Sequence, residues 1–371
     1  MKWYISKRAH GRIVDHDLAE SLAALAAIEA RLDAICSNNT QGTAFRIIGN
    51  WLVREEILRN YLQHIFFQTT SDVTILIPGF PVRGATKALY YLIFGTRIRA
   101  DISASAVFFR SNMRVFYNQQ QMTLWVARQQ QSPEKLNRAM VARKRFSSIS
   151  GFRQPRVLRQ DIAAKPPYIL EELVYGRRFG QASDWEVLAD KVLPCLFRFY
   201  DHGSIRHRRA AEVYNADWIS NEIASLTSEV KWKNKWVSLS QFLKAAEECL
   251  SMRDETIPLC IGHGDLGKSN FVVSVNGNFV LLDWEISREL PIAEELIKLV
   301  CQHPHLLHSL LPYVRRRTED PTAMPPRRQF LLATLDIIAG MGKFQEGRPW
   351  GTKKIKKWLC LASMLIAESD W

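Results

Sequence analysis

The chain has 371 residues, of which 47% are hydrophobic and 11% aromatic, so it can bury a large core and extensive disorder is excluded. This length favours two lobes or two domains. No run of about 18 uncharged apolar residues occurs, which excludes a transmembrane helix. The first residues carry charges at every turn, so we expect no secretory signal. The six cysteines form no CxxC pair, which suits a reducing compartment, and we predict a cytoplasmic protein.

Positive charge is in excess: 50 Lys and Arg against 37 Asp and Glu give a net charge of +13, which favours anionic partners. The basic residues are spread over several segments without a zinc-finger, helix-turn-helix or RNP-like signature, so we expect no specific nucleic acid partner. A basic amphipathic stretch, Lys353 to Trp358, leaves two interpretations open. It makes a peripheral contact with an anionic membrane at the inner face, or it is a final helix with a solvated basic turn.

Helical periodicity dominates the first 70 residues. One helix is predicted over residues 15–36, because leucines and isoleucines recur on a single stripe from Leu18 to Ile35. This stripe either packs on the rest of the protein or forms a short dimer coil. A second helix is predicted over residues 47–67. We therefore interpret residues 1–70 as a helical N-terminal extension that enlarges a lobe, forms a homodimer or docks a partner.

Beyond this extension the pattern changes to short strands. Apolar runs separated by polar residues predict strands over residues 73–77, 106–109, 115–117, 122–127, 157–158 and 168–174. Between the strands predicted over residues 122–127 and 157–158, a helix is predicted from Pro133 to about Ser147. After Gly176 the pattern is mainly helical, except for short strands near residues 271–275 and 279–283. The predicted fold class is α+β with two lobes: a β-rich N-lobe with a hinge over residues 71–175 and a helical C-lobe over residues 176–371.

The stretch Ile-Gly-His-Gly-Asp-Leu-Gly-Lys-Ser-Asn, residues 261–270, carries recognisable chemistry. Two apolar runs follow it, hinged at an Asn-Gly turn, so we expect a hairpin that returns Asp283 to the neighbourhood of Asn270. Asp265 lies on the loop before this hairpin. Three oxygen-bearing side chains then converge, which suits magnesium and phosphate chemistry. In phosphoryl transfer, one such aspartate accepts the hydroxyl proton, while an asparagine and a second aspartate hold the metal.

The His-Gly-Asp motif, with Leu-Leu-Asp-Trp-Glu around Asp283, resembles the aminoglycoside phosphotransferase and choline kinase families. Their fold is protein-kinase-like, and they phosphorylate hydroxyl groups of small molecules. The resemblance therefore implies an ATP- and Mg²⁺-dependent phosphotransferase that acts on a hydroxyl of a small molecule or sugar. The matched part covers residues 106–300.

Two flanking segments extend the resemblance. Residues 168–176 are similar to the hinge of these families, which implies that backbone groups at Glu171, Glu172 and Leu173 meet the adenine edge. The helix start after Pro291 is similar to the Pro-x-x-Asp-Leu pattern of these families, with Glu294 in place of the aspartate.

The resemblance also implies a role for each motif residue. Asp265 is the catalytic base that orients the acceptor hydroxyl, and Asn270 and Asp283 hold Mg²⁺. His263 either braces the loop by hydrogen bonds or takes a direct part in the chemistry. Lys268 either neutralises the transferring phosphoryl group or is a solvated loop lysine.

Two departures concern the ATP-facing lobe. Arg128 stands where a lysine is expected at the end of the third strand; its guanidinium can grip phosphate oxygens, but with a different reach. A glycine-rich phosphate loop is missing from the sequence, and we expect Ser103 and Ser105 to cover the phosphates instead. These departures make a pseudokinase, serving as a binding or regulatory module, the alternative function.

Other interpretations stay open. The basic surface favours an acidic acceptor, such as the sugar of a phosphorylated or envelope glycan. Phosphorylation of protein substrates is a further alternative, against which Gly264 and Trp284 argue. Four side chains supply enough ligands for zinc on paper: Cys301, His303, His305 and His308. Because Pro304 breaks the helix there and no second group has matching spacing, we expect a partly exposed helix end.

Overall fold

The chain forms two compact units, each assembled from several segments. The computed structural model describes residues 17–32, 42–48, 50–60, 85–109, 112–127, 133–147, 154–203, 205–229, 237–274, 276–318, 322–342 and 349–367. Unit 1 comprises Met1–Val141, Arg153–Arg178 and Val272–Glu285, and unit 2 comprises Ala142–Phe152, Phe179–Phe271 and Ile286–Trp371. The three-part division at residues 70 and 175 stays a prediction.

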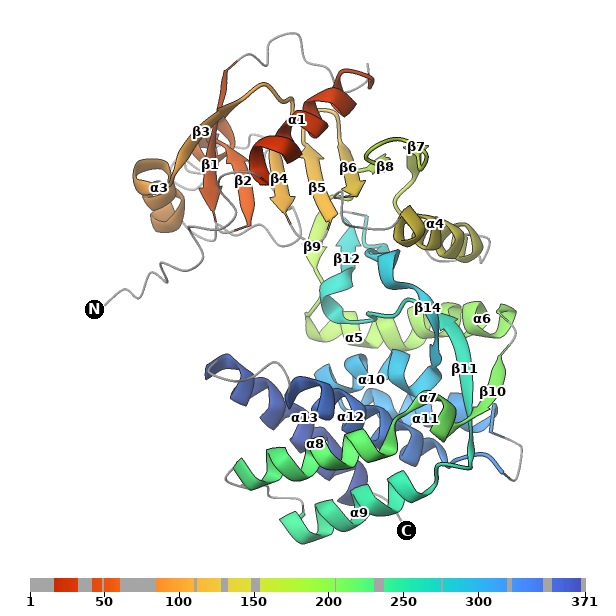
Figure 1. The fold of residues 1–371 in the computed structure, drawn as a ribbon. Helices are drawn as coiled ribbons and strands as arrows, with labels where there is room; N and C mark the ends of the chain where they lie inside the picture. Colours follow the sequence, from red (N-terminus) through yellow and green to blue (C-terminus); the bar gives the residue numbers. More distant parts are fainter. Residues whose placement is uncertain are drawn as a thin grey trace. The chain divides into compact units, whose positions relative to one another are not determined.

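Unit 1 is built on an eight-stranded antiparallel sheet (Figure 1), in the order β3-β1-β2-β4-β5-β6-β8-β7. The strands are β1 (Thr43–Ile48), β2 (Trp51–Arg54), β3 (Arg97–Ala100), β4 (Ala106–Phe109), β5 (Asn112–Tyr117), β6 (Met122–Ala127), β7 (Val157–Asp161) and β8 (Tyr168–Glu172). The helices are α1 (Asp17–Glu29), α3 (Ala85–Phe94) and α4 (Pro133–Ser147). The expected strands from residue 106 onward and the helix after Pro133 are confirmed, and so is the α+β class.

Part of the helix predicted over residues 47–67 is wrong, because β1 and β2 form an antiparallel hairpin there. The hairpin joins the sheet through β3 and β4. Leu52 is buried against one face of the sheet, whereas Trp51 and Val53 are buried against the other. A strand buried on both faces has a continuous apolar run, which helical spacing also fits. Residues 55–60 are helical, while residues 61–67 and the strand predicted over 73–77 lie outside the described residues.

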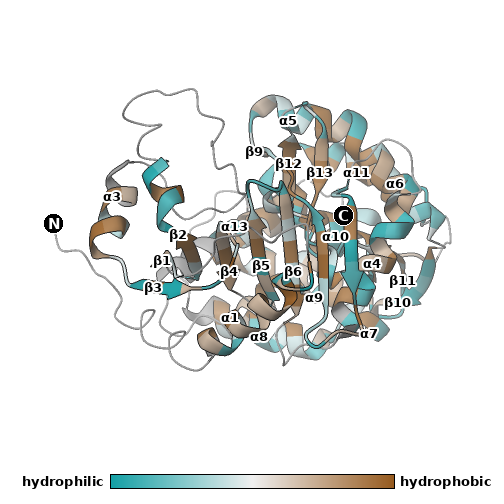
Figure 2. Ribbon diagram, turned by 90° about the horizontal axis from the view of Figure 1, so that it is seen from above, coloured by the Kyte–Doolittle hydropathy of each residue, from teal (hydrophilic) through white to brown (hydrophobic). Residues whose placement is uncertain are grey.

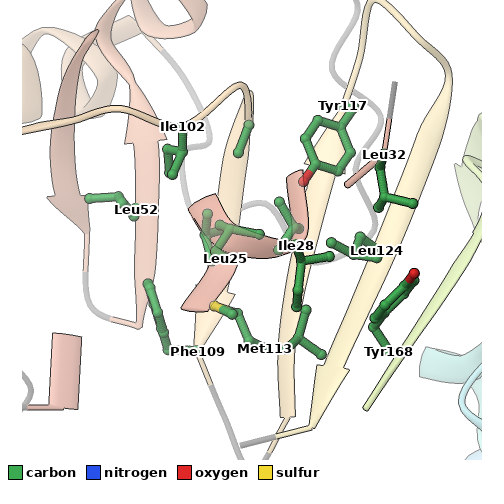
Figure 3. Packing of buried hydrophobic residues seen from close by; sticks show 14 of the residues in the cluster. Leu25, Ile28, Leu32, Leu52, Ile102, Phe109, Met113, Tyr117, Leu124 and Tyr168 are labelled. Carbon is green, nitrogen blue, oxygen red and sulfur yellow. The ribbon is translucent and has the colours of Figure 1, made fainter. Parts of the chain in front are cut away.

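Helix α1 covers one face of the sheet (Figure 3). Its buried residues Leu25 and Ile28, and Leu32 just after the helix, pack with side chains of the central strands, including Leu124. The predicted stripe thus packs within unit 1. Glu29, at the end of α1, is also buried. Its carboxylate accepts hydrogen bonds from the Ser103 amide, at 2.6 Å, and from the Tyr117 hydroxyl, at 2.8 Å, and these bonds offset the burial that raises its pKa.

The opposite face of the sheet is covered at both ends. Apolar residues of α3 pack near β1 and β2, where Ala88 meets Trp51 and Val53. At the other end, Leu136 of α4 packs with Trp125. The middle of this face, on β5, presents the polar side chains of Asn112 and Arg114 because side chains alternate along a strand. The sheet therefore carries its functional polar groups between two apolar areas.

A second sheet of unit 1 contains the predicted hairpin, with strand order β13-β12-β9. Its strands are β9 (Gly176–Arg178), β12 (Phe271–Ser274) and β13 (Phe279–Leu281). Gly277 lies in the connecting turn with φ +76°, a conformation that glycine adopts easily. This hairpin is confirmed where the Asn-Gly signal predicts it.

Unit 2 is mainly helical, as predicted, with one small sheet in the order β10-β11-β14. The strands are β10 (Arg206–Arg209), β11 (Thr256–Gly262) and β14 (Arg288–Pro291). The helices are α5 (Ala182–Val187), η1 (Leu188–Val192), α6 (Leu193–His202), α7 (Ala210–Val213), α8 (Ala216–Glu229), α9 (Leu239–Ser251), η2 (Lys268–Asn270), α10 (Ile292–Gln302), α11 (Leu306–Arg315), α12 (Pro326–Gly342) and α13 (Pro349–Ala367). Strand β10 is exposed along its whole length and hydrophilic, in contrast to β4 (Figure 2). Short helix η3 (Trp284–Ile286) follows β13.

The apolar side of the final helix, α13, is buried against the rest of the protein. In α13, Trp358, Leu361 and Leu365 are buried, while Lys356 and Lys357 are exposed. This pattern favours the interpretation of a last helix with a solvated basic turn. Among the helices that the structure describes, none has both the length and the hydropathy needed to cross a membrane.

One carboxyl group of α12, that of Asp336, should make the stability of unit 2 depend on pH. Burial, together with nearby Glu294, raises the pKa of Asp336 from 3.8 to about 6. The folded state therefore keeps a proton that the unfolded chain has lost, so stability should fall as the pH rises from about 4 to about 6. We predict that Asp336→Asn removes this decline, and that its melting temperature exceeds that of the wild type at pH 7 but not at pH 4. Thermal unfolding at several pH values, with exposed Asp254→Asn as the control, measures the difference in melting temperature between Asp336→Asn and the wild type. A difference that does not change with pH would contradict the prediction.

Candidate active site

The His-Gly-Asp loop, residues 263–265, follows β11 and is held to α10 by one buried carboxylate. Glu295 is 1% exposed. Its Oε1 accepts a hydrogen bond of 2.6 Å from the His263 amide, and its Oε2 one of 2.9 Å from the Gly264 amide. Tyr200 adds its hydroxyl at 3.3 Å. Burial raises the pKa of Glu295, while His263 and the two amides favour the charged form.

The start of α10 places two neighbouring glutamates differently. Glu294, which the sequence pattern aligns with the aspartate of Pro-x-x-Asp-Leu, forms an ion pair with Arg288 at 2.7 Å near the surface. Glu295 is the residue that turns inward to the loop. Successive helical residues are rotated by about 100°, so one of these side chains points outward and the other inward. The correspondence of Glu294 with the aspartate of that pattern stays a prediction.

Gly264 has a steric reason to be glycine. Its φ is +83°, and an added Cβ would lie 2.3 Å from the carbonyl oxygen of Ile286. Because both the left-handed backbone and the close approach exclude a side chain, larger residues cannot fit without moving the loop. The glycine of the His-Gly-Asp motif is therefore a requirement of this loop.

Asp265 is held from two sides while its side chain stays 46% exposed. Lys298 of α10 donates to Oδ1 at 2.6 Å. The side-chain amide of Asn270 donates to the backbone oxygen of Asp265 at 2.6 Å and to Oδ2 at 3.2 Å. The Asp265 amide itself lies 3.3 Å from Nδ1 of His263. This carboxylate is thus oriented and also accessible.

His263 and Lys268 lie in different surroundings. The ring of His263 is fully buried beneath the loop, a position suited to the bracing role expected from the sequence. Lys268 is exposed, and its backbone amide donates to Gln302 at 2.9 Å. The ammonium group that contacts Asp265 belongs to Lys298 instead. Sequence reasoning missed Lys298 because a single lysine in an amphipathic helix has no local signature.

In unit 1, Asp283 directly follows the hairpin and adopts an unusual backbone conformation. Its φ is +67°, which is costly for a residue other than glycine and is found mainly at functional sites. Arg114 of β5 forms an ion pair with its carboxylate. Asn112, two residues earlier on the same strand face, donates to Glu285. Trp284, between the two acids, is buried and donates to the Leu281 carbonyl at 3.3 Å.

Arg114 is a functional candidate that sequence reasoning missed. Its guanidinium lies 3.6 Å from the ring centre of Trp125, the residue opposite it on β6. The aromatic ring supports the charge by a cation–π interaction and directs it toward Asp283. Arg128, which was expected to provide the cation, lies outside the described residues. The signal in the sequence is an arginine between apolar residues, Met113 and Val115, of a strand.

Ser103 and Ser105 both have partners within unit 1. The amide of Ser103 donates to Glu29. The Ser105 amide donates to the carbonyl oxygen of Phe116 at 2.8 Å, and its hydroxyl accepts from the Asn118 amide at 3.1 Å. Both serines are buried. These contacts anchor α1 and the β5–β6 turn, and contact of the two serines with phosphates stays a prediction.

The predicted hinge residues are placed in the sheet of unit 1. Glu171 is buried on β8. The amides of Glu172 and Leu173 donate to the carbonyl oxygens of Arg156 and Gln121, at 2.9 and 2.7 Å. These two donors are therefore engaged by the protein itself. Contact of this segment with adenine stays a prediction that must use other backbone groups.

The donor atoms available for a metal are oxygens. Because the amide nitrogen of Asn270 binds Asp265, its carbonyl oxygen is the atom suited to a ligand. This oxygen, in unit 2, and the carboxylate of Asp283, in unit 1, are each hard donors of the kind that Mg²⁺ prefers. Within the described ranges, no three His, Cys, Asp or Glu side chains gather as a metal site. The zinc alternative at Cys301 to His308 thus has no support, and the ring of His303 stacks on Trp185 at 4.8 Å.

Comparison with known proteins gives matches among solved structures alone. No family model matches the chain, and no curated protein does. An aminoglycoside phosphotransferase from Alicyclobacillus acidocaldarius is 13% identical, with 70% of this chain and 89% of that chain covered and a TM-score of 0.47. A choline/ethanolamine kinase family protein from Mesorhizobium loti is 11% identical, with 70% and 91% covered and a TM-score of 0.43. A microcompartment-associated aminopropanol kinase is 18% identical, with 68% and 87% covered and a TM-score of 0.43.

The matched structures belong to the kinds of protein that the His-Gly-Asp motif resembles. With identities below 20% and TM-scores below 0.5, the likeness supports no statement about this chain. What the matched proteins act on is a property of those proteins, and the residues described above have to support any function of this chain.

The steric account of Gly264 can be tested against a glycine of similar backbone conformation. Gly277 has φ +76° and open space around its Cα. We predict that Gly264→Ala lowers the free energy of unfolding by about 1–3 kcal/mol more than Gly277→Ala, since only the first also collides with a carbonyl oxygen. Urea unfolding of both variants gives the difference. Equal losses would show that backbone conformation alone requires glycine at position 264.

Proposed function

We propose that the chain is a phosphotransferase that uses a magnesium-bound nucleoside triphosphate, ATP in the first instance, to phosphorylate a hydroxyl group of a small molecule. The observation that carries this proposal is the double anchoring of Asp265. Lys298 and Asn270 orient its carboxylate, which stays half exposed. An oriented, accessible carboxylate in a His-Gly-Asp loop is what a hydroxyl acceptor requires.

The proposed reaction is a direct transfer. Asp265 accepts the proton of the acceptor hydroxyl while the hydroxyl oxygen bonds to the γ-phosphorus, and the bond from that phosphorus to the β–γ bridging oxygen breaks. The products are a phosphate ester and the nucleoside diphosphate. Positioning contributes most of the catalysis in such transfers. The hydrogen bonds to Asp265 and its loop supply that positioning.

We assign metal binding to Asn270 and Asp283. The carbonyl oxygen of Asn270 and the carboxylate of Asp283 would hold Mg²⁺, which neutralises phosphate charge when bound. Asn270 precedes β12 and Asp283 follows β13, so the hairpin connects the two ligands in sequence. The left-handed backbone at Asp283 supports the assignment, because such strain is kept where it serves a function.

Arg114 is the cation that we assign to the nucleotide phosphates. It stands on the sheet face between α3 and α4 and is directed at Asp283. Guanidinium groups bind phosphate oxygens in a bidentate manner. In this assignment Arg114 takes the part that the phosphoryl-transfer template gives to a lysine on the third strand.

For the acceptor we favour an anionic small molecule or sugar. The net charge of +13 favours anionic ligands in general. An acidic sugar of an envelope or phosphorylated glycan fits this requirement, whereas a cationic amino alcohol does not.

Substitution of the two aspartates separates binding from chemistry. We predict that Asp283→Ala loses the stabilisation by Mg-ATP, while Asp265→Asn keeps it. At a nucleotide concentration a hundred times Kd, the wild type should gain about 2.7 kcal/mol. Asp265→Asn should also lower turnover by roughly 100-fold to 10,000-fold. Thermal unfolding with and without Mg-ATP, together with ADP formation, measures both effects, with exposed Asp254→Ala as control.

The same experiment distinguishes the alternatives. Binding of Mg-ATP without turnover by the wild type would favour a pseudokinase. The absence of a shift with either ATP or GTP at millimolar concentration would count against nucleotide binding altogether.

The assignment of Arg114 predicts a loss of affinity rather than of folding. We expect Arg114→Met to weaken Mg-ATP binding by roughly tenfold or more, because a charge-assisted contact to phosphate is lost. Arg99→Met, which changes an exposed arginine on β3 of the same sheet, should bind like the wild type. Calorimetric titration gives the Kd values. Unchanged affinity in Arg114→Met would contradict this assignment and favour Arg128 as the residue that binds the nucleotide phosphates.

A further inference from the structure

The contact between Lys298 and Asp265 lies wholly within unit 2. Lys298 Nζ is 2.6 Å from Asp265 Oδ1, which is the distance of a strong charge-assisted hydrogen bond. Oδ2 of the same carboxylate has a longer contact, 3.2 Å to Asn270. The two oxygens are therefore unequal: Oδ1 is occupied by the ammonium group, and Oδ2 is the one better able to accept a proton.

Helix α10 presents two charges to the catalytic loop from successive turns. Glu295 binds the loop backbone through the amides of His263 and Gly264. Lys298, three residues later, lies on the same side of the helix and binds the side chain of Asp265. Helix α10 thus fixes both the backbone of the loop and the orientation of the Asp265 carboxylate.

Exposure shows that this ion pair has little to do with stability. The side chains of Lys298 and Asp265 are 34% and 46% exposed. Ion pairs this open to water contribute little to the folded state, because solvent screens them and both side chains lose freedom. Glu295, by contrast, is buried. The contact of Lys298 can therefore be removed without unfolding the protein.

We infer that Lys298 is a positioning residue of the reaction: it fixes Asp265 through Oδ1 so that Oδ2 faces the acceptor hydroxyl. The inference rests on the proposed phosphotransferase function. It assigns to a helix residue outside the His-Gly-Asp motif a part in catalysis that acts through Asp265. Lys268, in the same loop, donates its backbone amide to Gln302, and the ammonium group at Asp265 Oδ1 is that of Lys298.

The test compares the full-length wild type with Lys298→Met, which keeps the length of the side chain, and Lys298→Arg, which keeps its charge. ADP formation from Mg-ATP is measured with water alone and with added sugars and sugar acids. We expect Lys298→Met to lower kcat roughly tenfold to a hundredfold, as for loss of one charge-assisted hydrogen bond. The KM for Mg-ATP and the melting temperature should stay near the wild-type values, and Lys298→Arg should restore most of the rate.

Two controls make the result specific. Lys244→Met removes a lysine of another exposed ion pair, with Glu248 on α9, and should leave kcat unchanged. In the double variant Lys298→Met/Asp265→Asn, the lysine substitution should add no further loss, because Lys298 acts through Asp265.

The outcomes separate this inference from the proposed function. An active wild type with an equally active Lys298→Met variant would overturn the positioning role and leave the function standing. A rate loss that follows a fall in melting temperature, or a further loss in the double variant, would also overturn it. A wild type that neither binds Mg-ATP nor forms ADP would overturn the function, and the inference with it.

Discussion

The position of the His-Gly-Asp loop depends on a single buried carboxylate, that of Glu295. Glu295 would be costly to bury as a charge without partners, and the two loop amides, with Tyr200, provide those partners. The dependence is mutual, because the His-Gly-Asp loop is also held where its amides meet α10. Moving the loop would remove both amide hydrogen bonds from the buried Glu295 carboxylate. The geometry at Asp265 therefore follows from an interaction that is well away from water.

In unit 1 strand β5 supplies the side chains that orient the acidic residues, as α10 does in unit 2. Asn112 and Arg114 extend from one face of β5 and bind the two acids that flank Trp284. The apolar areas under α3 and α4 leave this polar strip between them. In each unit the reactive groups lie on a loop, whereas the groups that orient them lie on a regular element. Rigid elements position side chains more accurately than loops do.

The parts of this structure that could be predicted are those with local signals. The Asn-Gly turn, the proline at the start of α4 and the spacing of the His-Gly-Asp motif each act over a few residues. Lys298 and Arg114 gave no such signal, since their partners lie 33 and 169 residues away. Helical spacing also fits the end of β1 and strand β2, because β2 is buried on both faces of the sheet. Strand β10, with three arginines and a histidine, lacks the apolar alternation by which strands are recognised.

The docking of α1 has a consequence for where a shortened chain can begin. This helix is part of the core of unit 1, although it comes long before the residues that resemble a kinase. A chain starting at β4 would expose Leu124 and its apolar neighbours to water over the whole outer face of the sheet. It would also leave the Tyr117 hydroxyl without the Glu29 carboxylate to which it now donates. The boundary of the folding unit therefore lies well ahead of the boundary of the recognisable motifs, and an exposed sheet face of this kind invites association between chains.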